Sequence, residues 1–294
     1  MLHIERILCP VDFSEPSVRA YDYAQSEARH YQAKLFLQHV VAFDLPSYEY
    51  YAPALYLVER FQRIRSDAQE HLQEFAKSHT GNGVQPEVLV PEGAVTNSIL
   101  SFAQVQKVNL IVMGTHGPNE LDRLTLGSVV EKVLRKACCP VLVIPARRRD
   151  LVAPRDAPGS ARLRKFLFCT DFSDPSHRAL EYALAAAADY NAELTLLHVL
   201  EDVPIWADVG AVIATATKRL AKMIPPEGAK TAKIQAVVRI GRAYQQIIQL
   251  ALAAQADLII MAVRGRNALD LAVFGSTTSR VIQSGSCPVL AVQV

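Results

Sequence analysis

The sequence predicts an α/β protein of two tandem doubly wound units, each a five-stranded parallel sheet (order 3-2-1-4-5) with helices on both faces. Three observations predict this fold. The chain contains a long internal repeat, and within each copy short β-rich runs alternate with helical patterns. Its 294 residues, 50% of them hydrophobic, are enough for the cores of two ordinary domains.

The repeat sets the number of domains. Residues 7–40 match residues 166–199 at a constant offset of 159 (166 − 7), and the stretch that starts at Asn109 matches the one that starts at Asp257 at an offset of 148 (257 − 109). The second copy is therefore shorter by 11 residues (159 − 148) in its middle. A duplicated unit of this length predicts two copies of one fold.

The segment between the copies is expected to be an exposed linker. It has no apolar periodicity and contains two prolines and a glycine. We expect a first domain over 1–146, a linker over 147–162 and a second domain over 163–294. The run Arg147-Arg148-Arg149 is open to two interpretations, contact with phosphates or lipids and simple solvation.

The elements of the first copy follow from local patterns. Ser14 is expected to cap a helix that tolerates Pro16 in its first turn. Polar residues then fill a long helix that ends near Thr80. The other predicted elements are strands over 4–11, 35–41, 84–90, 109–113 and 141–144 and helices over 15–31, 94–104 and 128–136. Alternating strands and helices of this kind build a parallel sheet that is covered on both faces.

Composition excludes some classes of function. The 31 basic and 29 acidic side chains give a formal net charge of +2, which favours neither nucleic acid nor a membrane surface as partner. The N-terminal residues lack the pattern of a signal peptide, and no apolar stretch reaches a membrane-spanning length. The expected location is cytoplasmic. Five scattered cysteines are more typical of reduced, buried thiols than of a disulfide framework, with redox sensing as the alternative.

A candidate phosphate site lies at the ends of two strands. In open parallel sheets ligands bind beyond the carboxyl ends of the strands, where the winding reverses. Asp12 follows the first strand, and Gly114 and Gly117 follow the fourth. Such glycines permit positive φ and close approach of main-chain amides, and Gly127-Ser128 opens a helix whose N-terminus attracts anions. The alternative is ordinary turn and helix-start chemistry.

These residues carry a family resemblance. The pattern Gly114-x-x-Gly117-x₉-Gly127-Ser128, with Asp12 after the first strand, resembles the ATP-binding motif of the universal stress protein family. The opening ILCPVDFSEPS, the segment LQHV and the closing CPVLVIP are also similar to that family. The resemblance implies ATP as ligand, with or without Mg²⁺, and a role in stress response. The residues that it places around ATP are Pro10, Val11, Asp12, Val40, Gly114, His116, Gly117, Gly127, Ser128 and Val129.

The second copy departs from this motif at one position. Ala262 stands where the first glycine is expected, and its methyl group is expected to crowd a ligand. The residues retained or substituted at the other positions are Asp171, Arg264, Gly265, Gly275 and Ser276. We expect the second site to be weakened or empty.

Histidines and aromatic residues near the strand ends allow further interpretations. His39 and His198 are expected to be structural, because neither has the neighbours of a metal site. His116 either contacts a phosphate or belongs to an exposed turn. The segment 48–53 is rich in tyrosine, and Trp206 lies in the corresponding loop of the second copy. Each either covers a nucleotide base or packs at the surface.

Three classes of function remain open on the sequence alone. A nucleotide-dependent regulator accounts for the phosphate site and for the lack of an obvious catalytic set. An ATP hydrolase is the enzymatic alternative. It is expected to be slow, because the sequence has no Walker lysine, serine nucleophile elbow, HxGH motif or SGGxDS motif, and no catalytic residue can be named. A scaffold that ignores nucleotide is the third. In the resembling family, domains pair through their last strands, which implies an internal pseudo-dimer here through 140–144 and 288–292, with further homodimer formation open.

Overall fold

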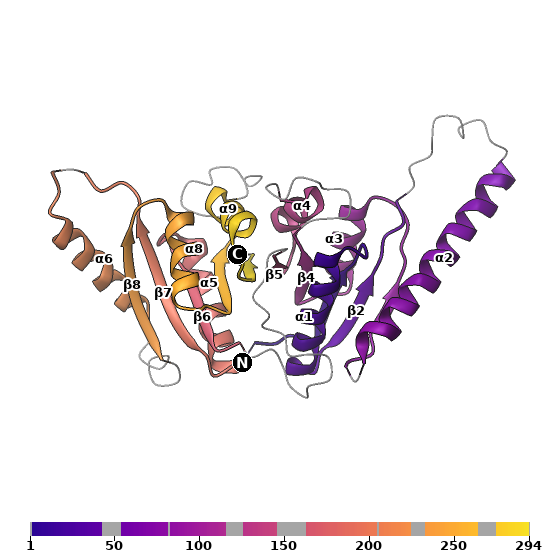
Figure 1. The fold of residues 1–294 in the computed structure, drawn as a ribbon, viewed down its shortest axis with the longest axis horizontal. Helices are drawn as coiled ribbons and strands as arrows, with labels where there is room; N and C mark the ends of the chain where they lie inside the picture. Colours follow the sequence, from indigo (N-terminus) through magenta and orange to yellow (C-terminus); the bar gives the residue numbers. More distant parts are fainter. Residues whose placement is uncertain are drawn as a thin grey trace.

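One sheet runs through the whole molecule. The computed structural model describes residues 2–42, 54–81, 83–115, 126–145, 163–204, 206–224, 233–263 and 275–293. Within them ten strands form a single sheet in the order β3-β2-β1-β4-β5-β10-β9-β6-β7-β8 (Figure 1). Each copy therefore has its first strand at the centre, its second and third strands on one side and its fourth and fifth on the other. Pairing within each copy is parallel.

The first copy comprises the following elements: β1 Arg6–Pro10, α1 Glu15–Tyr31, β2 Lys34–Gln38, α2 Ala54–Thr80, β3 Glu87–Leu89, α3 Val95–Val105, β4 Leu110–Gly114, α4 Ser128–Lys136 and β5 Val141–Ile144. The second comprises β6 Lys165–Cys169, α5 Asp174–Asp189, β7 Glu193–Leu200, α6 Val209–Met223, β8 Ile234–Ile240, α8 Ala243–Ala253, β9 Leu258–Ala262, α9 Ser276–Ser284 and β10 Val289–Val292. The predicted elements of the first copy are all present, although β1, β2 and β3 are shorter than expected.

The start of each copy's first helix shows why the repeat folds twice in the same way. Ser14 caps α1, its side chain accepting a hydrogen bond from the Ser17 N–H, and a proline occupies the first turn as predicted. Ser173 caps α5 through the Ser176 N–H in the same manner. Such caps satisfy main-chain donors that the helix leaves without an internal partner. The chain direction after the first strand is thus fixed by local chemistry in both copies.

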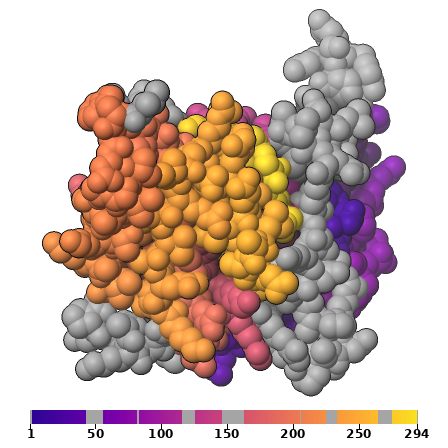
Figure 2. All heavy atoms as spheres, turned by 60° about the vertical axis from the view of Figure 1, so that its left-hand side comes forward, coloured from indigo at the N-terminus to yellow at the C-terminus, as the bar shows by residue number. Residues whose placement is uncertain are grey.

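Helices cover both faces of the sheet, so the molecule has three layers with the sheet in the middle. One core lies under α1, α2, α5 and α6, and the other lies under α3, α4, α8 and α9. Each core contains side chains of both copies, so apolar burial continues across the join. Figure 2 brings the second copy forward, with the first copy (indigo to purple) behind it.

The copies join edge to edge. β10 pairs with β5 in antiparallel fashion, with Leu290 opposite Leu142. The Gln293 side-chain amide donates a hydrogen bond of 2.8 Å to the Leu134 carbonyl oxygen, which links β10 to the helix α4 of the other copy. The join leaves β3 and β8 as the edges of the sheet. In the described part of the chain, no helix combines the length and apolarity needed to cross a membrane.

Candidate functional site

The turn after β1 presents Asp12 at the carboxyl end of the sheet. Its Oδ1 accepts hydrogen bonds from the Ser14 N–H (3.0 Å) and the Ser14 hydroxyl (2.5 Å). Between them Phe13 adopts φ 63°, a left-handed conformation that is uncommon for a residue with a side chain. Asp12 is half-buried. One carboxylate oxygen of Asp12 thus orders the turn. Asp12 follows the central strand β1, which is where the winding of the sheet reverses.

The second strand adds main-chain groups beside this turn. The His39 N–H donates to the Leu89 carbonyl and the Val41 N–H to the Pro91 carbonyl, both on the β3 side. Main-chain groups alternate in direction along an extended segment, so the Val40 amide and carbonyl are directed to the opposite side, beyond the end of β1. No described residue forms a hydrogen bond with them. The main-chain groups of Val40 are therefore directed to the same strand-end region as the Asp12 turn.

The start of α4 is held against the end of β4. The Gly127 N–H donates a 3.0 Å hydrogen bond to the Thr115 carbonyl, which closes the segment between them. Gly127 is the N-cap of α4 and provides no side-chain cap. Ser128 is exposed, Val129 is half-buried, and the helix begins next to the end of β4. Because a helix N-terminus carries partial positive charge, this position suits an anion.

Gly114 makes a close packing contact with the first helix. It is the last residue of β4, paired with Ile144, and neither it nor Gly127 has positive φ. A Cβ on Gly114 would lie 2.7 Å from the main-chain carbon of Pro16 and 2.8 Å from its Cβ. The freedom to adopt positive φ is therefore not used at Gly114. The glycine allows the first turn of α1 to pack on the end of β4.

We expect Gly114→Ala to lower the free energy of unfolding by about 1–3 kcal/mol, because the added methyl group overpacks against Pro16. Urea denaturation measures the change. The matched control is Ala262→Gly in the second copy, which removes a methyl group instead of adding one and is expected to cost about 1 kcal/mol. An unchanged urea midpoint for Gly114→Ala would show that α1 moves aside without cost.

The second copy repeats most of this geometry. Asp171 Oδ1 accepts from the Ser173 N–H (3.0 Å) and the Ser173 hydroxyl (2.5 Å), and Phe172 adopts φ 61°. The Gly275 N–H donates to the Val263 carbonyl at 3.2 Å, so α9 also starts at the end of its strand, with exposed Ser276 as its first residue. Ala262, the last residue of β9, occupies the position that corresponds to Gly114 in the first copy.

Several predicted residues lie outside the described part of the chain. They are His116, Gly117, Arg264, Gly265, the tyrosine-rich segment 48–53 and the whole linker 147–162, including Arg147-Arg148-Arg149. Trp206 is described and is 87% exposed. The Pro10, Val11, Asp12, Val40, Gly114, Gly127, Ser128 and Val129 positions all belong to the ends of β1, β2 and β4 or to the start of α4.

The two strand-end histidines are structural, as expected. His39 Nδ1 lies 2.9 Å from the Val11 carbonyl oxygen, and His198 Nδ1 lies 2.8 Å from the Thr170 carbonyl oxygen. Each ring also packs on the left-handed phenylalanine of its copy, with centroids 4.6 Å apart in the first and 4.1 Å in the second. These contacts tie the first two strands together beneath the candidate site.

Two features of the site were not predicted. His71 of α2 stacks on Phe13 with ring centroids 4.1 Å apart, which brings a long helix against the Asp12 turn. Gly93 adopts φ 117° and donates its N–H to the Val41 carbonyl, and Gly241 repeats this with φ 130° and the Leu200 carbonyl. Gly93 and Gly241 occupy equivalent positions in the repeat, and this shared glycine could have indicated the turn from the sequence.

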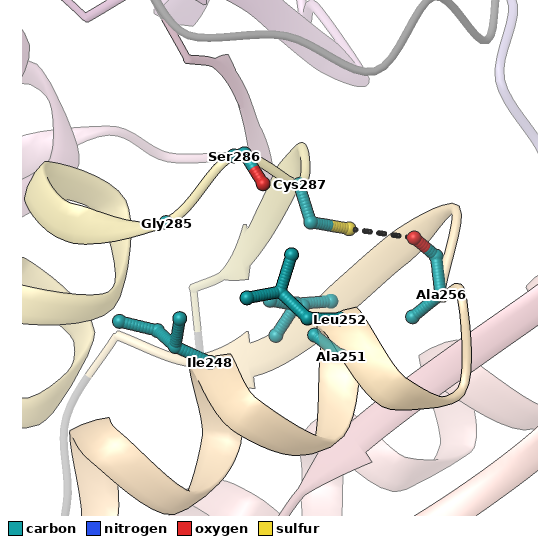
Figure 3. Close-up of a pocket in the computed structure, with 8 residues that line it drawn as sticks. Ile248, Ala251, Leu252, Ala256, Gly285, Ser286 and Cys287 are labelled. Atoms are coloured by element: carbon teal, nitrogen blue, oxygen red, sulfur yellow. Dashed lines mark hydrogen bonds between the residues drawn. The ribbon is translucent and has the colours of Figure 1, made fainter.

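Cysteines contribute to the core instead of to this site. All five are free thiols, and Cys138 alone is exposed. Figure 3 shows a hollow between α8 and α9, lined mainly by apolar side chains, where the Cys287 thiol donates to the Ala256 carbonyl at 3.2 Å. Cys287 and Ala256 precede β10 and β9, so the hollow lies at the amino ends of the strands, opposite the candidate site. Burial raises the pKa of the Cys139 thiol to about 12, which disfavours a reactive thiolate there.

Comparisons with known proteins agree with the repeat. The family model for the universal stress protein family matches residues 3–145 and again residues 162–293. A universal stress protein of Mycolicibacterium smegmatis is 28% identical over 305 aligned positions, which cover 98% of this chain and 96% of that protein. One of Methanocaldococcus jannaschii is 33% identical over 147 positions, 50% of this chain and 85% of the relative.

The fold has a solved counterpart over its full length. The crystal structure of a universal stress protein from Archaeoglobus fulgidus superposes with a TM-score of 0.71 at 23% identity, covering 98% of this chain and 96% of that one. With the family model matched in both halves, the chain belongs to the universal stress protein family and carries its domain in tandem.

Proposed function

We propose that this protein is an ATP-binding regulator of the stress response, with its nucleotide site in the first copy. The observation that carries the proposal is the placement of the Asp12 turn and the α4 N-terminus at the carboxyl ends of β1 and β4, which are neighbours in the sheet. An adenosine contact at Asp12 and Val40 and phosphate contacts at Gly127, Ser128 and Val129 fit these positions.

In this proposal the second copy binds nucleotide more weakly than the first. Its Asp171 turn and α9 N-terminus keep the main-chain frame, while Ala262 places a methyl group where the first copy has Gly114. We therefore assign tighter binding to the first copy. The paired β5 and β10 strands make the chain an internal pseudo-dimer in this proposal.

Ser128→Glu is the variant that tests the site. Ser128 is exposed, and a carboxylate in the first turn of a helix is compatible with the helix dipole, so folding should be preserved. The same carboxylate repels the phosphates, and we expect affinity for ATP to fall about 100-fold, or roughly 3 kcal/mol. Calorimetric titration of nucleotide-free protein with ATP, with and without Mg²⁺, measures the change.

Ser276→Glu is the matched control, since Ser276 is the exposed first residue of α9. It is expected to leave the tighter site intact. A loss confined to Ser276→Glu would move the site to the second copy, and no binding by the wild type would favour a nucleotide-independent scaffold. Release of phosphate in single-turnover assays would identify the slow hydrolase instead.

A further inference from the structure

A cavity lies at the join of the two copies, away from the strand-end sites. Its empty volume is about 410 Å³ including its opening to solvent, and α1 and α5 contribute most of its polar side chains. Figure 1 shows these helices on either side of β5 and β10. Residues near the amino ends of the strands complete the wall.

The wall of the cavity follows the repeat. Tyr23 and Tyr182 are equivalent in the two copies, as are Tyr31 and Tyr190, and Leu142 of β5 faces the cavity together with its equivalent Leu290 of β10. Equivalent residues of the two copies therefore face each other across the cavity, and most of its lining is aromatic or aliphatic. Four phenol rings around one space also provide π faces that attract cations.

One pair breaks this equivalence. Glu27 lines the cavity from α1, while its counterpart in α5 is Ala186. Glu27 is 5% exposed, and its Oε2 accepts a 2.8 Å hydrogen bond from the Tyr190 hydroxyl. Among the described residues, none donates to its second oxygen. The cavity thus contains a single carboxyl group in otherwise phenolic and aliphatic surroundings.

The Tyr182 hydroxyl also lacks a partner. Its oxygen is buried and forms no hydrogen bond with any described residue. A buried polar atom of this kind costs free energy unless a ligand or a water molecule satisfies it. The hydroxyl and the second oxygen of Glu27 therefore leave hydrogen-bonding capacity for an occupant of the cavity.

A histidine and a carboxylate lie beside the tyrosines that line the cavity. From α1, His30 stacks on Tyr190 at 4.0 Å, and burial lowers the pKa of its ring. From α5, Asp189 accepts a 2.7 Å hydrogen bond from the Leu2 N–H of the N-terminal segment. No lysine or arginine lines the described part of the cavity. Burial raises the pKa of Glu27 to about 7, so an empty cavity holds a proton on this carboxyl over much of the neutral range.

We propose that this cavity binds a small alkylammonium ion, with the ammonium group on the Glu27 carboxylate and the alkyl chain against the tyrosine rings and leucines. The ammonium donates to the second Glu27 oxygen and to the Tyr182 hydroxyl oxygen. A buried carboxylate needs a cation for compensation, and the surrounding phenol rings favour one. Binding displaces the proton of Glu27 to solvent, so the complex forms with release of up to one proton.

The probe is n-propylammonium chloride, titrated into nucleotide-free protein at matched ionic strength and followed by NMR and calorimetry. With a carboxyl pKa of about 7, the ionised fraction of Glu27 falls between pH 8 and pH 5.5, and we expect roughly 30-fold weaker affinity at the lower pH. The neutral analogue 1-propanol is expected to bind at least 10-fold more weakly than the ammonium at pH 8.

Two variants locate the site. Glu27→Gln is expected to abolish both the ammonium preference and the pH dependence, and Ala186→Leu is expected to fill the space and prevent binding by either probe. Equal affinity in Glu27→Gln, equal binding of 1-propanol, or no saturable binding by the wild type would each overturn the proposal. Since ATP is absent, these outcomes are independent of the nucleotide site.

Discussion

Ala291→Asp is expected to lower the free energy of unfolding by about 4 kcal/mol or more. Ala291 is fully buried in β10, between Val141 of β5 and Met261 of β9. A carboxylate there has no cationic partner in an aliphatic core, and an unpaired buried charge costs several kcal/mol. Urea denaturation followed by circular dichroism measures the loss.

Ala253→Asp provides the control, because Ala253 is exposed at the end of α8. We expect it to change stability by less than about 1 kcal/mol. Since the cores continue across the join, Ala291→Asp should weaken both copies in one transition. A second copy that unfolds alone, with the first copy unaffected, would contradict that expectation.

Glu27→Gln is expected to stabilise the protein at pH 8 by roughly 3 kcal/mol and to have little effect at pH 4.5. Burial raises the pKa of Glu27 from 4.5 to about 7, so the folded state binds more protons than the unfolded state between these values. Stability contributed by the protonated form is therefore lost as pH rises through this window. The glutamine is neutral throughout and can still accept from the Tyr190 hydroxyl.

Thermal and urea unfolding of wild type and variant at several pH values test this sign. Glu181→Gln, at an exposed position of α5, is the matched control and should leave the pH dependence unchanged. A difference between wild type and Glu27→Gln that stays constant with pH would show that the carboxyl keeps an ordinary pKa.

Local patterns predicted the elements and the repeat, because helix caps and strand alternation depend on residues close in sequence. Ser14 and Pro16 show this for α1, and Ser173 shows it again for α5. Family resemblance then supplied the expected site residues. The described site residues lie at the ends of the strands that the prediction named. Asp12 follows β1, and Ser128 begins the helix after the neighbouring strand β4.

Contacts between distant segments were beyond local patterns. The motif drew attention to Gly114, but it did not reveal the packing contact that requires a glycine there. That contact is with Pro16, nearly 100 residues away in sequence. A glutamate in a helix is ordinarily expected at the solvent-exposed surface. Glu27 is buried instead, because the second copy covers it and Tyr190 donates a hydrogen bond to it. Phe13 has no glycine-like character, yet its partners His39 and His71 stabilise the left-handed turn.

The pairing of β5 with β10 also bears on how the two copies diverge. In a symmetric pair of identical chains, every substitution appears on both sides of the interface, and a carboxyl at the Glu27 position would face a second carboxyl across the axis. Covalent linkage keeps the partner at a high effective concentration regardless of dilution, and it lets one copy carry glutamate while the other carries alanine. Fusion thereby permits a carboxyl group on one side only of a cavity whose tyrosines and leucines come from both copies.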